Sequence, residues 1–152
     1  MHFAKQRQNL FLMTILLNKI KAGIEDFIDT HKIKALGFVP PTIKREVQLM
    51  QFLKTGIDIA IPLINIQKIS GKIPIPQKSL SNLAERINNA DTTFTIPEMH
   101  RYHKILLFDD AVGSGVTLNQ IAKKIKEKGV TKYIIGLAIV GSFIGFDVIA
   151  DV

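Results

Sequence analysis

The stretch that most constrains the fold of this chain is residues 104–118, KILLFDDAVGSGVTL. It opens with an unbroken apolar run, which is typical of a strand buried on both faces of a parallel sheet. Asp109 and Asp110 stand at the carboxyl end of this run, and a turn of small residues follows them. After the turn, apolar residues recur at helical spacing from Leu118 to Ile125. A strand, an acidic pair, a glycine turn and a helix in this order predict a phosphate-binding site.

The residue types in the turn indicate which phosphate compound binds there. Glycines allow backbone N–H groups to converge on an anion, the following helix contributes its positive end, and Ser114 and Thr117 offer hydroxyl groups. Carboxylates would repel a phosphate, so we expect Asp109 and Asp110 to contact sugar hydroxyls or a hydrated Mg²⁺ instead. The sequence therefore favours a sugar phosphate as the ligand. The alternative is an acidic strand end followed by an ordinary glycine turn.

The remainder of the chain predicts a single α/β domain over residues 1–152, with an N-terminal helical segment at 1–30 and a core at 35–152. A length of 152 residues suits one domain with a substantial core. Strands separated by helices or long crossovers predict a mainly parallel central sheet flanked by helices. The expected strands are 35–39, part of 57–69 interrupted by Pro62, 92–96, 105–108, a continuous buried strand at 133–140, and 147–152. The expected helices are 10–28, one capped by Thr42 and ending at Thr55-Gly56, 82–89, and one from Val116 to Lys128-Gly129, with a loop at 70–79.

Composition limits the kinds of chemistry and partner. The absence of cysteine excludes thiolate metal sites, redox motifs and thiol nucleophiles, and it permits a cytoplasmic location, which we expect. A net charge of +7 favours polyanionic partners, either nucleic acid or phosphorylated small molecules. The lysines are scattered, however, and those at 123–128 resemble the solvated face of a helix, so nucleic-acid binding is possible without specific support.

Two further features have an ordinary structural interpretation. The apolar segment at 10–17 is far shorter than the roughly 20 residues that a membrane span needs, so we predict an amphipathic helix that faces the core or a dimer partner. We accordingly expect a homodimer and no membrane association. His100 and His103 lie in a polar connector with Glu98 as the nearby carboxylate, and we predict that they are solvated rather than metal ligands.

The segment LLFDDAVGSGVTL resembles the phosphoribosyl-pyrophosphate (PRPP) loop of type I phosphoribosyltransferases, and the chain is most similar to their ComF-like, competence-associated branch. The resemblance covers roughly residues 35–140. Its other matching positions are Val39-Pro40, Lys44-Arg45, Gln77-Lys78-Ser79-Leu80, Arg86 and Asn88-Asn89-Ala90. The chain departs from the family by having Gly113-Ser114-Gly115 in place of Thr-Thr-Gly, which removes one hydroxyl. It also has a reduced pyrophosphate pattern at Arg45-Glu46-Val47-Gln48 and lacks the family's four-cysteine module, so no zinc is predicted.

The resemblance implies a role for each matching position. Asp109 and Asp110 would be catalytic, holding the ribose hydroxyls and stabilising an oxocarbenium-like transition state. Lys44 and Arg45 would face the pyrophosphate, and Lys78 would belong to a lid. The 5-phosphate would be bound by Val112, Gly113, Ser114, Gly115, Val116 and Thr117. Phe143 or Phe146 would stack on the base, unless they are simply core residues. Mg²⁺ would be held through PRPP, with no direct protein ligand.

Three functions follow from these observations. The first is a phosphoribosyltransferase that binds PRPP and Mg²⁺ and transfers the phosphoribosyl group to or from a nucleobase-like acceptor. The second is a non-catalytic module that binds PRPP or a nucleotide, as a regulator or an accessory of DNA uptake. The third and most distant is a Rossmann-like methyltransferase, because Asp-x-Ala-Val-Gly-Ser-Gly also resembles the cofactor loop of adenine-type DNA methyltransferases. That loop normally follows the first strand, whereas only 34 residues follow Leu118 here, and no Asn-Pro-Pro-Tyr tetrapeptide is present.

Overall fold

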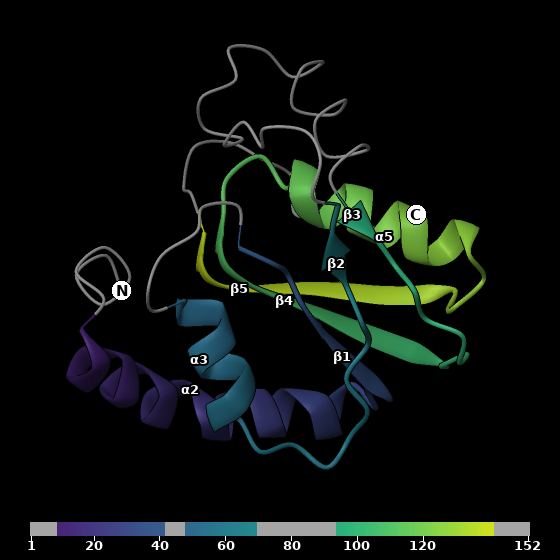
Figure 1. The fold of residues 1–152 in the computed structure, drawn as a ribbon. Coiled ribbons are helices and arrows are strands. Elements are labelled where there is room, and N and C mark those ends of the chain that lie inside the picture. The colour runs from purple at the N-terminus through teal and green to yellow at the C-terminus, as the bar shows by residue number, and fades with distance from the viewer. Residues whose placement is uncertain (1–8, 42–47, 70–93, 142–152) are drawn as a thin grey trace.

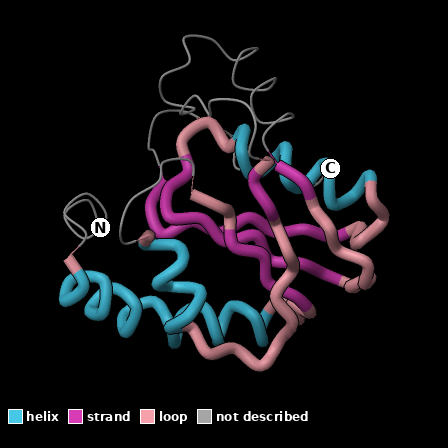
Figure 2. The backbone as a smooth tube through the Cα atoms, viewed as in Figure 1, coloured by secondary structure: helices cyan, strands magenta, loops and turns pink. Residues whose placement is uncertain are grey.

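A parallel sheet with helices on both faces forms the centre of the molecule. The computed structural model describes residues 9–41, 48–69 and 94–141. Its elements are α2 (Leu10–Thr30), β1 (Ala35–Phe38), α3 (Leu49–Gly56), β2 (Gln67–Lys68), β3 (Phe94–Thr95), β4 (Lys104–Val112), α5 (Val116–Glu127) and β5 (Tyr133–Gly141). Strands β1, β4 and β5 are parallel and lie in the order β1-β4-β5. Helices α2 and α3 lie on one side of this sheet and α5 on the other (Figures 1 and 2), which confirms the predicted fold class.

The middle strand β4 carries a hydrophobic core on each of its faces, because successive side chains of a strand point to opposite faces. Leu106 and Phe108 belong to the core shared with α2 and α3. Ile105 and Leu107 belong to the core shared with α5, where Ile121 is also fully buried. The apolar run of β4 is therefore buried on both faces, as its sequence predicts.

Strand β5 differs from its prediction. The run at 133–140 was expected to be continuously buried, but β5 is one of the two outer strands of the described three-stranded sheet, and its side chains are half-buried or exposed. Tyr133 is 57% exposed and Val140 is 44% exposed. An apolar run identifies a strand in a parallel sheet, but it does not distinguish a middle strand from an outer one.

The helices agree with the sequence except at one end. Helix α2 confirms the amphipathic N-terminal helix, with Ile24 and Ile28 buried against the sheet. Helix α3 ends at Gly56 as expected, but it begins at Leu49. The predicted start is wrong because the backbone of Gln48 is extended, with φ of −94° and ψ of 114°, so a helix cannot run through it. Thr42 itself lies outside the described residues.

The segment 57–69 forms only an isolated bridge and the two-residue strand β2, instead of the expected strand with an irregular continuation after Pro62. Pro62 accepts a hydrogen bond from the Leu36 N–H at 2.9 Å, and the Ile64 N–H donates to the Leu36 carbonyl at 2.9 Å. This makes an isolated parallel bridge beside β1, and proline cannot continue a ladder because it lacks an N–H. The close approach requires Gly37, since a Cβ there would lie 2.7 Å from the Ile64 side chain.

The end of the 57–69 segment pairs with the β-prone segment 92–96 instead. Strands β2 and β3 are antiparallel, with Gln67 opposite Thr95 and Lys68 opposite Phe94. The expected loop at 70–79, helix at 82–89 and strand at 147–152 lie outside the described residues. Within the described parts of the chain, no helix combines the length and the apolar character needed to cross a bilayer.

Candidate functional site

The acidic pair lies within β4 rather than after it. Strand β4 continues to Val112, and Asp109 stands opposite Ala138 of β5. The Asp110 N–H donates to Oδ1 of Asp109 at 2.7 Å, and Asp110 is buried, with 7% of its surface exposed. Strand alternation assigns Asp109 to the α5 face of the sheet and Asp110 to the opposite face. The two carboxylates therefore border the strand end from both sides.

The turn after β4 leads directly into α5, and the conformation of Gly115 makes this possible. Gly115 is the N-cap of α5 and has φ of +71°, a left-handed conformation that favours glycine. Its carbonyl accepts the Asn119 N–H at 2.9 Å, which closes the first helical turn. Val116 is buried, so the start of the helix is fixed against the core.

The amino end of α5 is arranged to receive an anion. No side chain caps it and no acidic residue stands in its first turn. The first backbone N–H groups of a helix have no intrahelical acceptor, and together with the helix dipole they favour a negatively charged ligand. The predicted helix start near Val116 and its end at Lys128-Gly129 are both confirmed.

Gly113 has a different environment from Gly115. It is exposed, its φ is not in the left-handed region, and a Cβ built on it meets no heavy atom within 4 Å. Glycine is therefore not required at Gly113 by backbone conformation or by packing. The turn therefore has room for a side chain at this position.

The structure brings together one group of predicted site residues and leaves a second group unplaced. Asp109, Asp110 and the predicted 5-phosphate loop, Val112, Gly113, Ser114, Gly115, Val116 and Thr117, form one continuous unit of strand end, turn and helix start. Ser114 and Thr117 are half-buried. The predicted pyrophosphate, lid and base-pocket residues lie outside the described residues. They are Lys44, Arg45, Lys78, Phe143 and Phe146.

Among the described residues, no group of three or more histidine, aspartate or glutamate side chains is placed to hold a metal. Mg²⁺ usually keeps several waters and is bound through one or two carboxylates together with substrate phosphates. The carboxylates of Asp109 and Asp110 fit that arrangement.

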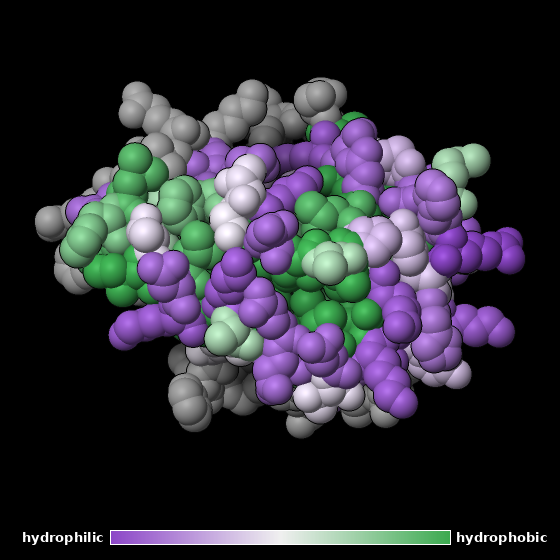
Figure 3. All heavy atoms as spheres, turned by 90° about the horizontal axis from the view of Figure 1, so that it is seen from below, coloured by the Kyte–Doolittle hydropathy of each residue, from purple (hydrophilic) through white to green (hydrophobic). Residues whose placement is uncertain are grey.

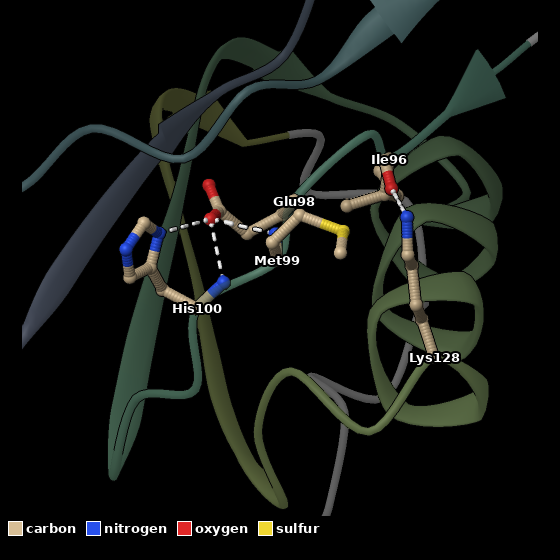
Figure 4. A network of polar contacts seen from close by, with 5 residues as sticks. All are labelled: Ile96, Glu98, Met99, His100 and Lys128. Atoms are coloured by element: carbon tan, nitrogen blue, oxygen red, sulfur yellow. Dashed lines mark hydrogen bonds and ion pairs between the residues drawn. The ribbon is translucent and has the colours of Figure 1, made fainter.

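The two histidines of the polar connector do not form a metal site in the described structure, but His100 is not merely solvated (Figure 4). One carboxylate oxygen of Glu98, Oε1, accepts the N–H groups of Met99 and His100, both at 3.0 Å, and lies 3.2 Å from His100 Nδ1. Glu98 is itself 9% exposed. The Lys128 ammonium donates to the Ile96 carbonyl from the end of α5. These contacts fix the connector that leads into β4.

This Glu98 network was not predicted from the sequence, where Glu98 was recognised only as the carboxylate near the two histidines. The His100 backbone N–H is the main reason that the pKa of Glu98 is lowered, and burial opposes that effect. Burial, followed by the charge of Glu98, raises the pKa of Tyr102. The Glu98 carboxylate therefore acts as a structural anchor of the connector.

Comparison with known proteins identifies the fold. No model of a protein family matches the chain, and no curated protein matches its sequence. An adenine phosphoribosyltransferase has a similar structure, with a TM-score of 0.55 and 14% identity over 90% of this chain and 73% of that one. A purine phosphoribosyltransferase from Pyrococcus horikoshii Ot3 gives a TM-score of 0.51 and 16% identity over 89% and 78% of the two chains.

A third similar structure is the adenine phosphoribosyltransferase from Saccharomyces cerevisiae, solved in complex with adenine and a dideoxy-imino-altritol bisphosphate. It gives a TM-score of 0.52 and 14% identity over 89% of this chain and 71% of that one. The chain therefore has the α/β fold of the phosphoribosyltransferases.

Proposed function

We propose that this protein binds PRPP at the unit formed by the end of β4, the glycine turn and the start of α5, and transfers a phosphoribosyl group to or from a nucleobase-like acceptor. The observation that carries the proposal is the uncapped amino end of α5, which directly follows an acidic strand end in a phosphoribosyltransferase fold. The 5-phosphate would accept hydrogen bonds from the backbone N–H groups between Ser114 and Thr117.

Asp109 and Asp110 would act on the ribose. Because strand alternation directs them to opposite faces of β4, they would hold different hydroxyl groups rather than share one. During transfer, the bond from ribose C1 to pyrophosphate breaks and pyrophosphate leaves with the electron pair. A ring nitrogen of the base then bonds to C1 and releases its proton to the departing pyrophosphate or to solvent. The two carboxylates would stabilise the positive charge that develops on the ribose between these events.

The remaining assignments extend the proposal along the family resemblance. Lys44 and Arg45 would face the pyrophosphate, Lys78 would contribute to a lid that excludes water, and Phe143 or Phe146 would contact the base. Bound Mg²⁺ would neutralise charge on the pyrophosphate. We further propose that the chain belongs to the ComF-like branch.

We also propose that the protein forms a homodimer. The first turns of α2 carry a group of exposed apolar residues, seen at the left of Figure 3. They are Leu10, Phe11 and Ile15, which are 54%, 73% and 38% exposed. An apolar group of this kind at one end of a helix suits contact with a second copy of the chain.

A second candidate is a module that binds PRPP or a nucleotide without turning it over. Gly113 favours it, because this position lacks a hydroxyl donor although the structure leaves space for one. The order of the strands disfavours the methyltransferase alternative. Its glycine loop should follow the first strand of the domain, whereas here the loop follows β4, with β1 earlier in the chain and parallel beside it.

Isothermal titration calorimetry with PRPP and Mg²⁺ tests the proposal. We expect the wild type to bind, and Asp109→Asn/Asp110→Asn to bind at least tenfold more weakly, because hydrogen bonds to charged groups contribute about 1.5–3 kcal/mol each. Asp26→Asn/Asp29→Asn is the matched control, since it removes the same charge from exposed positions on α2. No binding by the wild type contradicts both phosphoribosyl functions. Binding without pyrophosphate release across a panel of bases selects the non-catalytic module.

A further inference from the structure

Three basic segments meet at the edge of the sheet where the strands begin, at the opposite ends of the strands from the candidate site. The Lys34 N–H donates to the Lys104 carbonyl at 2.9 Å, which joins the segment before β1 to the start of β4. The Thr131 hydroxyl donates to the His103 carbonyl at 2.9 Å, which joins the segment before β5 to the same place. Strand neighbours lie about 4.8 Å apart, so the three strand starts span only about 10 Å.

We call this surface the basic edge and define it as residues 31–34, 100–104 and 130–133. These segments contain five lysine or arginine residues and three histidines, but no aspartate or glutamate. Its cations are Lys32, Lys34, Arg101, Lys104 and Lys132, and its histidines are His31, His100 and His103. All of these side chains are exposed except that of Lys104, which is half-buried and donates to the His31 carbonyl at 3.0 Å. Figure 3 shows hydrophilic residues gathered at the right-hand end of the molecule, where the strands begin.

Aromatic rings are interspersed with these cations. Tyr133 is 57% exposed, and its ring centroid lies 5.5 Å from that of His103. The rings of His100 and Tyr102 are 6.5 Å apart. Exposed aromatic rings beside cations provide the stacking faces that single-stranded nucleic acids use, whereas an acidic peptide has no bases to stack on them.

The backbone of the basic edge is held in place. The Glu98 carboxylate binds the His100 backbone and ring, so the connector is fixed before Arg101. Lys32 follows the end of α2 with φ of +53°, a left-handed conformation that is costly for a residue other than glycine. This conformation belongs to the end of α2, where the Ile33 N–H donates to the Ile28 carbonyl at 3.0 Å and the Lys32 N–H donates to the Asp29 carbonyl at 3.2 Å.

We propose that the basic edge binds single-stranded nucleic acid, with phosphates contacting its cations and a base stacking on Tyr133. Asp109 and Asp110 follow Lys104 by five and six residues in β4, so about 17–20 Å separates the basic edge from the acidic pair. The two sites can therefore be occupied independently.

Fluorescence anisotropy with labelled oligothymidylate and oligouridylate of about 15 nucleotides tests the proposal, and the two oligonucleotides distinguish DNA from RNA. We expect the wild type to bind at least one of them. Arg101→Glu/Lys132→Glu should weaken binding at least tenfold, and it should make the slope of log affinity against log salt shallower by about 1.4, since each phosphate contact to a single strand contributes about −0.7. Lys19→Glu/Lys54→Glu, the same charge change at exposed positions on α2 and α3, should leave both values near those of the wild type.

Substitutions of Tyr133 test whether a base stacks on its ring. Tyr133→Ala should bind about tenfold more weakly while Tyr133→Phe keeps the wild-type affinity, because stacking needs the ring and not the hydroxyl. Lys32→Gly should weaken binding while making the fold more stable, which separates loss of contact from loss of structure.

The proposal is overturned if neither oligonucleotide binds, or if the control pair Lys19→Glu/Lys54→Glu weakens binding as much as Arg101→Glu/Lys132→Glu. It is also overturned if poly-glutamate competes as well as the oligonucleotides and Tyr133→Ala has no effect, since the edge would then be a general anion surface. PRPP binding, measured in parallel, should be unchanged in every basic-edge variant.

Discussion

The turn after β4 contains two glycines, Gly113 and Gly115, and the backbone requires glycine at only one of these positions. Gly115 needs its residue type, because its φ of +71° would cost a residue with a Cβ about 1–2 kcal/mol. Gly113 has no such requirement, since a Cβ there meets nothing within 4 Å. The glycines of a sequence motif therefore cannot all be assigned the same role, and only the backbone conformation separates them.

This difference predicts that Gly113→Thr strengthens PRPP binding without harming the fold. The added hydroxyl would donate to the 5-phosphate, and we expect PRPP affinity to rise about three- to tenfold at an unchanged midpoint of thermal unfolding. Calorimetry and thermal unfolding on the same protein sample provide both values. Gly115→Ala is the matched control, and it should lower stability. Weaker PRPP binding by a stably folded Gly113→Thr would contradict the placement of the phosphate.

The connector between β3 and β4 depends on one buried carboxylate. Glu98 accepts three hydrogen bonds within residues 98–100, and hydrogen bonding lowers its pKa from the ordinary value of 4.5. A carboxylate whose pKa is lower in the folded state stabilises the protein above its unfolded pKa. That contribution is lost as the pH falls through the lower, folded value.

We therefore predict that Glu98→Gln lowers the free energy of unfolding at pH 6 by about 1–2 kcal/mol, and that the difference from wild type shrinks as the pH falls below about 4. Urea denaturation across this pH range measures both effects. Glu127→Gln, which removes an exposed carboxylate that pairs with Lys123 at 3.9 Å, should change stability by less than about 0.5 kcal/mol. A Glu98→Gln curve parallel to that of the wild type would show that the carboxylate is not an anchor.

Sequence patterns predicted the main helices and strands, but not always how buried they are or where they begin. The starts of β4 and α5 were predictable because an unbroken apolar run and a glycine turn have few alternative structures. The exposure of β5 was not predictable, since it depends on what covers an outer strand, and β1, the other outer strand of the described sheet, is buried throughout. The beginning of α3 was missed because the extended backbone of Gln48 has no signal in its residue type.

At the level of the whole molecule, the sheet determines what lies at each end. Parallel strands bring all their carboxyl ends to one edge and all their amino ends to the other. The sequence located the first edge, because its chemistry is continuous from Asp109 to Thr117. It did not reveal the basic edge, whose cations come from three segments that are far apart in the chain. Such a surface becomes visible only when the strand order β1-β4-β5 is known.

At the candidate site, the residue types alone did not determine where the two carboxylates point. The acidic pair was expected at the end of the strand, but it lies within the last four residues of β4, and the direction of each carboxylate follows from the extension of the strand to Val112. Residues 109–112 are compatible with either a strand or a turn, so their types did not predict this extension. A sugar phosphate bound here would be recognised by backbone N–H groups at the turn and by carboxylates on both sides of β4.

The most direct test is a titration of ¹⁵N-labelled protein with ribose 5-phosphate, followed by amide chemical shifts. This ligand carries the phosphate and the hydroxyl groups but no pyrophosphate, so it addresses the turn alone. We predict that the largest shifts occur at the amides of residues 113–118, while those of the basic edge at 31–34 and 130–133 change little. Saturable binding that leaves the amides of 113–118 unshifted would contradict a phosphate site at the start of α5.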